Sequence, residues 1–147
     1  MKPNLLFVLF FVWSFISCDS ALKKNQEQIK QLDTEILKIH DEAMPKIGKV
    51  LSLRKQVYGK IDSCDHKGWK DSLQAVGYSL SKADQDMMDW MHHYEVPQMN
   101  DTALAYLQRQ LNIISDVKNE VFDGINKAEQ TLIQYQLYQN NKHHDEN

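Results

Sequence analysis

The sequence has few of the residues that form turns: its 147 residues include five glycines and three prolines. These are too few for an all-β protein with many turns or for a long disordered linker. An excess of positive charge is also missing, since the net charge is −3. A nucleic-acid partner usually requires a basic face, so we expect none. The length is that of one domain with a single hydrophobic core.

Motifs of the common enzyme classes are missing as well. The sequence contains no nucleophile elbow, no P-loop and no glycine-rich phosphate-binding loop. It also lacks the ExxH pairs of di-iron helical bundles. His40, Asp41 and Glu42 are of catalytic residue types, but consecutive residues of a helix point in different directions. We therefore expect a protein that is not an enzyme.

Cysteine occurs only at Cys18 and Cys64. Cys18 follows an apolar run, residues 5–16, which at about 1.5 Å per residue spans roughly 18 Å. That is well short of the ~30 Å hydrocarbon core of a bilayer, so the run predicts a secretory signal and not a transmembrane helix. Cys64 and His66 form a Cys-x-His pair. One such pair makes no metal site, and we expect a free loop cysteine there.

The four residues Phe15-Ile16-Ser17-Cys18 resemble a bacterial lipobox, the site where signal peptidase II cleaves before a diacylated cysteine. Ile16 and Ser17 fit the pattern, whereas Phe15 replaces the usual aliphatic residue. The resemblance implies that Cys18 becomes the N-terminus and carries acyl chains. Two or three such chains hold a protein stably to a lipid bilayer. A rival cleavage after Ser20 would discard Cys18.

The lipobox implies a location in the bacterial cell envelope, on the periplasmic or surface face of a membrane. Asp19 follows the cysteine directly. An aspartate there favours inner-membrane sorting in some bacteria, and nearby acidic residues mark surface export in others. Both membranes therefore remain open. With Cys18 acylated, Cys64 has no partner for an intramolecular disulfide.

Three stripes of apolar residues at helical spacing follow the signal. The clearest covers residues 69–94 in steps of four and three, which is the pattern of a coiled-coil-like seam. The other two cover residues 29–57 and 104–135. In the last of these stripes Lys118 occupies an apolar position, where its long stem can lie along the core. Pro45 interrupts the first stripe without shifting its phase.

These stripes predict an all-α fold. Short connections at residues 58–68 and 95–101 make neighbouring helices antiparallel, which gives an up-down-up three-helix bundle with coiled-coil-like seams. Because proline removes a backbone hydrogen bond, we expect the first helix to be kinked at Pro45. The predicted parts are a signal peptide (1–17), a lipidated N-terminus and tether (18–28), the helical bundle (29–140) and a polar tail (141–147).

One group of residues suggests metal chemistry: His40, Met44, Met88, Met91 and His92. Thioether and imidazole ligands together suit copper as Cu(I). His40 and Met44 share a helix face, as do Met88 and His92, because each pair is four residues apart. A turn near residue 63 would place His40 opposite residues 87–91. Against this interpretation, methionine commonly fills core gaps, and the tight ligand spacing of a specific metal motif is missing.

The segments "EILKIHDEAMPKIGKV" and "MMDWMHHYE" resemble small helical bacterial lipoproteins, some of which carry the label "viral A-type inclusion protein". The resemblance implies helical repeats and no mechanism. We therefore expect a membrane-anchored lipoprotein that acts as a non-enzymatic interaction or structural module. Its partners would be the bilayer and either another protein or a second copy of the chain. A copper-binding periplasmic lipoprotein is the alternative.

Overall fold

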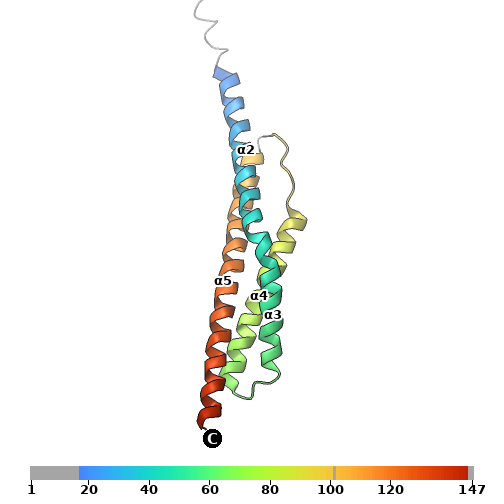
Figure 1. Ribbon diagram of the computed structural model, residues 1–147. Coiled ribbons are helices and arrows are strands. Elements are labelled where there is room, and N and C mark those ends of the chain that lie inside the picture. The colour runs from blue at the N-terminus through green and yellow to red at the C-terminus, as the bar shows by residue number, and fades with distance from the viewer. Residues whose placement is uncertain (1–16, 101, 146–147) are drawn as a thin grey trace, which may run out of the picture.

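The computed structural model describes residues 17–100 and 102–145, and over these ranges it contains helices and no strand. Residues 1–16, most of the predicted signal peptide, lie outside this description. The elements are α2 (Ser17–Ala43), the short 3-10 helix η1 (Met44–Lys46), α3 (Ile47–Ile61), α4 (Lys67–His93) and α5 (Ala103–Asp145). The predicted all-α fold with helices packed together is confirmed (Figure 1).

The first part of the chain is helical almost without interruption. Residues 18–28, which the sequence assigns to the lipidated N-terminus and tether, belong to α2. The next break is η1, with Pro45 in its first turn, where a missing backbone N–H costs least. The short helix α3 then continues to Ile61. The 3-10 segment therefore lies at the position where the sequence predicts a kink.

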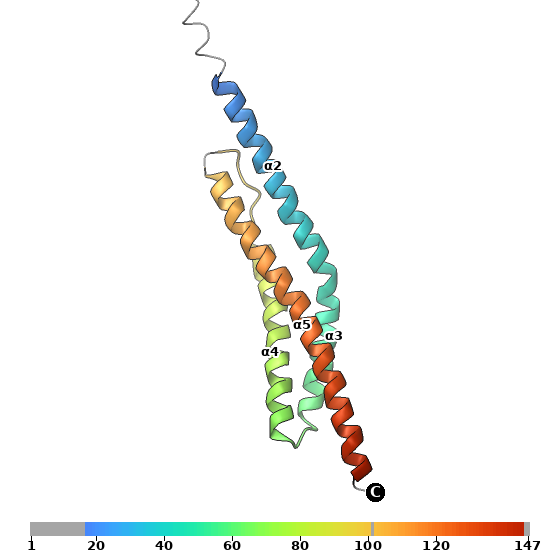
Figure 2. The ribbon, with the colours of Figure 1, turned by 90° about the vertical axis from the view of Figure 1, so that its left-hand side faces the viewer.

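The long helix α5 contacts α2, α3 and α4. Figures 1 and 2 show α2 beside the N-terminal part of α5 and α3 beside its C-terminal part. One ion pair joins Glu42 to Lys118, and another joins Lys49 to Glu129. The segments 42–49 and 118–129 therefore run in the same direction.

Helix α4 packs on both α3 and α5. Lys82 forms an ion pair with Glu120 at 2.7 Å, and the Trp90 indole donates to the Gln110 side chain at 3.0 Å. Position 82 of α4 thus contacts position 120 of α5, and position 90 contacts position 110, so the two helices run in opposite directions. Helix α4 ends at His93. The N-terminal part of α5 lies beside α2 and beside the connection that follows α4 (Figure 2).

The core follows the three predicted apolar stripes. Its largest fully buried side chains are Ile36, Val50, Val57, Leu73, Leu80, Met87, Leu107, Ile114 and Val121. Each such side chain contributes about 1.5–3 kcal/mol when it leaves water. Lys118 occupies a position of an apolar stripe, and its amine extends from there to form a hydrogen bond with the carboxylate of Glu42. In the same way Arg54, a polar residue of the first stripe, donates to Asp84 of α4 at 2.9 Å.

The C-terminal residues differ from expectation in their secondary structure. Residues 141–145, predicted as part of a polar tail, continue α5 to Asp145. Lys142 contacts Asp65 in the α3–α4 connection at 3.4 Å. Tyr138, one turn earlier, packs against the core. A polar composition therefore did not prevent helix formation, because one face of this last turn still meets the connection.

Candidate functional site

The predicted metal ligands come from two parts of the chain. His40 and Met44 are half-buried around the end of α2, whereas Met88, Met91 and His92 are exposed on α4. Among the described residues, no group of three or more His, Cys, Asp or Glu side chains is placed to hold a metal ion. Copper binding through thioethers and imidazoles stays the alternative hypothesis.

His40 lies against an aromatic ring of α4. Its imidazole and the Trp90 indole have centroids 5.5 Å apart and planes inclined by 31°. Trp90 belongs to the segment 87–91, which the expected register places opposite His40. The Nδ1 atom of His40 lies 3.0 Å from a carboxylate oxygen of Asp41. His40 therefore connects α2 to α4 by ring packing.

We call the surrounding group the aromatic junction: Asp33, His40, Trp90, Tyr94, Tyr106 and Gln110. Trp90 and Tyr94 stack with centroids 4.8 Å apart, and Tyr94 stacks on Tyr106 at 6.3 Å. The Tyr106 hydroxyl accepts a hydrogen bond from the backbone N–H of Glu95 at 2.8 Å. The junction therefore joins α2, α4 and α5 where α4 ends.

The polar atoms of the junction fix α2 in its place. The Tyr94 hydroxyl donates a hydrogen bond to the carboxylate of Asp33, 61 residues earlier in the chain. Burial is the main cause that raises the pKa of Tyr94, and the hydrogen bond to Asp33 and its charge raise it further. The phenol therefore remains a protonated donor at neutral pH, which suits a structural contact and not proton transfer.

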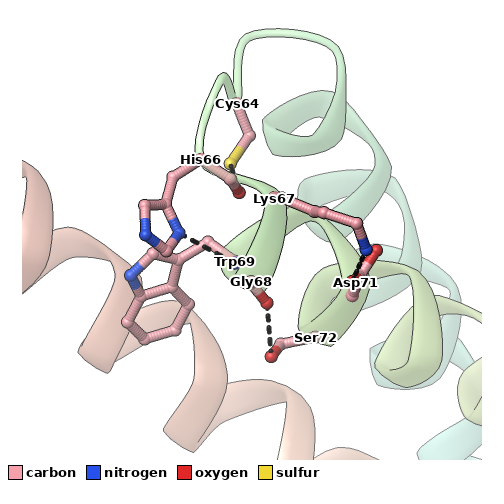
Figure 3. Close-up of polar contacts among 7 residues, drawn as sticks. All are labelled: Cys64, His66, Lys67, Gly68, Trp69, Asp71 and Ser72. Atoms are coloured by element: carbon pink, nitrogen blue, oxygen red, sulfur yellow. Dashed lines mark hydrogen bonds and ion pairs between the residues drawn. The ribbon is translucent and has the colours of Figure 1, made fainter.

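A second cluster lies at the α3–α4 connection (Figure 3). His66 is the N-cap of α4, and its Nδ1 atom accepts from the backbone N–H of Trp69 at 3.3 Å. Cys64 is free and buried, and its thiol donates to the His66 carbonyl at 3.4 Å. Cys64 lies in the loop, as the sequence predicts, and its burial was not foreseen.

Aromatic rings of α5 close this second cluster. The Trp69 ring lies 5.7 Å from both Tyr135 and Tyr138, and His66 lies 5.4 Å from Tyr138. Burial raises the pKa of Tyr135, and a hydrogen bond with Cys64 raises it further. We call Cys64, His66, Trp69, Tyr135 and Tyr138 the turn cluster. It holds the end of α5 against the connection.

Several apolar side chains remain at the surface. Val96 and Met99, in the connection between α4 and α5, are 80% and 54% exposed. Sequence periodicity could not identify them because they lie outside any helix. Met88 and Met91, which lie off the seam of the stripe 69–94, are also exposed. Tyr106, which also lies off the seam, is instead half-buried in the aromatic junction.

The proposed lipidation site, Cys18, is the second residue of α2, and its side chain lies outside the described part of the structure. Over the described residues, no helix combines the length and the apolar character needed to cross a membrane. Comparison with known protein families, with curated proteins and with solved structures finds no match for this chain.

Proposed function

We propose that this chain is a lipid-anchored helical module of the bacterial cell envelope, which acts through protein contacts and not by catalysis. The observation that carries the proposal is the apolar run of residues 5–16 with the lipobox-like residues Phe15-Ile16-Ser17-Cys18 at its end. Diacylation and cleavage would make Cys18 the first residue and place two or three acyl chains on it. The apolar area of these chains is sufficient for stable anchoring.

The arrangement of α2 supports a spacer between this anchor and the bundle. Residues 22–28 are exposed, and Ile29 is the first buried residue among the side chains of α2 that the structure describes. Figures 1 and 2 show that the start of α2 projects beyond the connection between α4 and α5. A helix over residues 18–28 would rise about 16 Å. The bundle would therefore stand clear of the lipid headgroups, with its surface accessible to partners.

The bundle itself is, in this proposal, an up-down-up arrangement in which α2 and α3 form one arm bent at Pro45. Three observations support this topology. The arm and α5 run in the same direction. Helices α4 and α5 run in opposite directions. The 3-10 segment Met44–Lys46 separates the two helices of the arm. Such a bundle presents long exposed helix faces, which are suited to binding other helices.

The decisive experiment is the intact mass of the N-terminal peptide, measured on protein extracted from its native membranes. A diacylglyceryl or triacylated cysteine at position 18 supports the proposal. A free N-terminus at Ala21 overturns the anchor. The matched control is Cys18→Ser, which removes the acylated thiol and should leave an unprocessed chain. Crosslinking in the same membranes tests the interaction role, and a chain that remains monomeric and captures no partner contradicts it.

A further inference from the structure

A groove of about 380 Å³ runs between α4 and α5 next to the aromatic junction. Three apolar side chains line it: Trp90 and Val117, which are buried, and Ile113. Ile113 is 46% exposed although it is large and apolar. Carboxylates from both helices also line it: Asp86, Asp89, Asp116 and Glu120. The groove thus combines one exposed apolar side chain, Ile113, with four carboxylates.

The charges of this groove are only partly balanced. Lys82 binds both Asp86 and Glu120 at one end of it. Asp89 and Asp116 are exposed, and over the described residues their carboxylates have neither an ion pair nor a hydrogen bond. Four carboxylates therefore face one lysine and the His93 imidazole. Such an excess of negative potential attracts a positively charged partner and repels an acidic one.

The lining residues recur at helical spacing on both walls of the groove. On α4 they recur at positions 86, 89, 90 and 93, and on α5 at positions 110, 113, 116, 117 and 120. These steps of three and four place each set on one face of its helix. The groove between two packed helices accepts the side-chain ridge of a third. The carboxylates are distributed along the groove, which differs from the compact ligand group of a metal ion.

We propose that this groove docks a basic amphipathic helix of a partner protein. Apolar residues of the partner, three and four positions apart, would pack against Ile113, the exposed apolar side chain of the groove. Its flanking lysine or arginine residues would pair with Asp89 and Asp116. The proposal rests on the proposed interaction function and deepens it by naming the kind of partner. Charge complementarity selects a basic helix over a neutral or acidic one.

The test uses the full chain purified in a zwitterionic detergent and a fluorescent peptide of about 18 residues, long enough to cover the groove. Its leucines recur at three- and four-residue spacing, and lysines flank them. A scrambled peptide of equal composition distributes the leucines around the helix. Fluorescence anisotropy gives the affinity of each peptide at low salt and at about 0.15 M salt.

The decisive variant carries Asp89→Asn and Asp116→Asn, which remove the two unbalanced charges and touch no described ion pair. We expect it to bind the peptide about tenfold more weakly at low salt, with a smaller difference at higher salt. The matched control is Glu27→Gln with Glu35→Gln, which removes the same charge from α2 and should leave binding unchanged. Comparing variants in one detergent cancels any binding of the peptide to micelles.

Three results would overturn the groove assignment. The first is an unchanged affinity in the Asp89→Asn and Asp116→Asn variant, and the second is equal binding of the scrambled peptide. The third is self-association of the chain that this variant abolishes while peptide binding persists, because the occupant would then be a second copy. None of these results alters the N-terminal mass, so failure of the groove is distinguishable from failure of the anchor.

Discussion

Alanine in place of Gly124 tests how closely α5 approaches α4. Gly124 is buried, and a Cβ atom there would lie 3.6 Å from Cδ2 of Leu80 and 3.9 Å from Oγ of Ser79. These are ordinary van der Waals distances, so the added methyl group fits. Glycine in a helix interior is about 1 kcal/mol less favourable than alanine. We therefore expect Gly124→Ala to raise the free energy of unfolding by about 1 kcal/mol.

Gly77 in α4 provides the contrasting case. A Cβ atom there would lie 3.1 Å from Cε1 and Cζ of Tyr58, which is closer than side-chain atoms normally approach. Tyr58 is 45% exposed, and its hydroxyl lies 3.4 Å from Oγ of Ser81. The ring can move outward by a few tenths of an ångström, but it loses packing when it does. Gly77→Ala should therefore stabilise less than Gly124→Ala, with a net effect near zero.

The assay is thermal unfolding followed by circular dichroism, with Gly48→Ala as the reference. A Cβ atom at Gly48 meets no atom within 4 Å, so this variant reports helix propensity alone. A gain of about 1 kcal/mol raises Tm by about 2–4 °C in a domain of this size. Gly77→Ala should recover the full gain in a Tyr58→Ala background, because the close contact is then absent. A destabilising Gly124→Ala would refute the reasoning, since α4 and α5 would have to lie closer together than described.

Three further predictions concern the two clusters and the copper alternative. His66→Ala removes the N-cap of α4 and should lower the free energy of unfolding by about 1 kcal/mol in a denaturant titration, whereas His66→Asn restores a capping acceptor and should lose less. Because the folded state raises the pKa of Tyr94 above its ordinary value of 10.0, its contribution to stability is present below that pH and is lost as the pH rises through the folded pKa. Tyr94→Phe should therefore flatten the alkaline fall in Tm, and Tyr78→Phe, at an exposed site, should not. In a titration of Cu(I) against a competing chelator we expect no uptake, since His40 packs against an indole; retention of one equivalent would establish the copper site instead.

Hydrophobic periodicity predicted the helices because burial repeats every three or four residues along a packed helix. The expected turn near residue 63 placed His40 opposite residues 87–91, where Trp90 meets it. Periodicity carries no information about polar partners distant in sequence. The hydrogen bond from Tyr94 to Asp33 depends on the rotation of two helices about their axes, and apolar spacing constrains that rotation only roughly.

The turn cluster and the groove escaped prediction for a related reason. His66 caps α4 although Ser, Thr, Asp and Asn are the residue types usually taken as N-cap signals. Asp89 and Asp116 look like ordinary solvated residues in the sequence, where 27 positions separate them. Only the pairing of α4 with α5 brings them to the two sides of one groove. The position of an acidic surface is therefore a property of the packed helices.

Lys118 shows how a polar residue can occupy an apolar stripe, and its ion pair predicts an acid dependence. Its hydrogen bond to Glu42 is the main cause that lowers the pKa of that carboxyl, and its charge lowers it further. The contribution to stability is therefore present above the ordinary value of 4.5 and is lost as the pH falls through the lower folded pKa. Lys118→Met keeps an apolar stem and removes the charge. Its Tm should lie below that of the unsubstituted chain at neutral pH, and the difference should close well below pH 4.5. A difference that persists in acid would mean that Lys118 stabilises the bundle through its stem and not through Glu42.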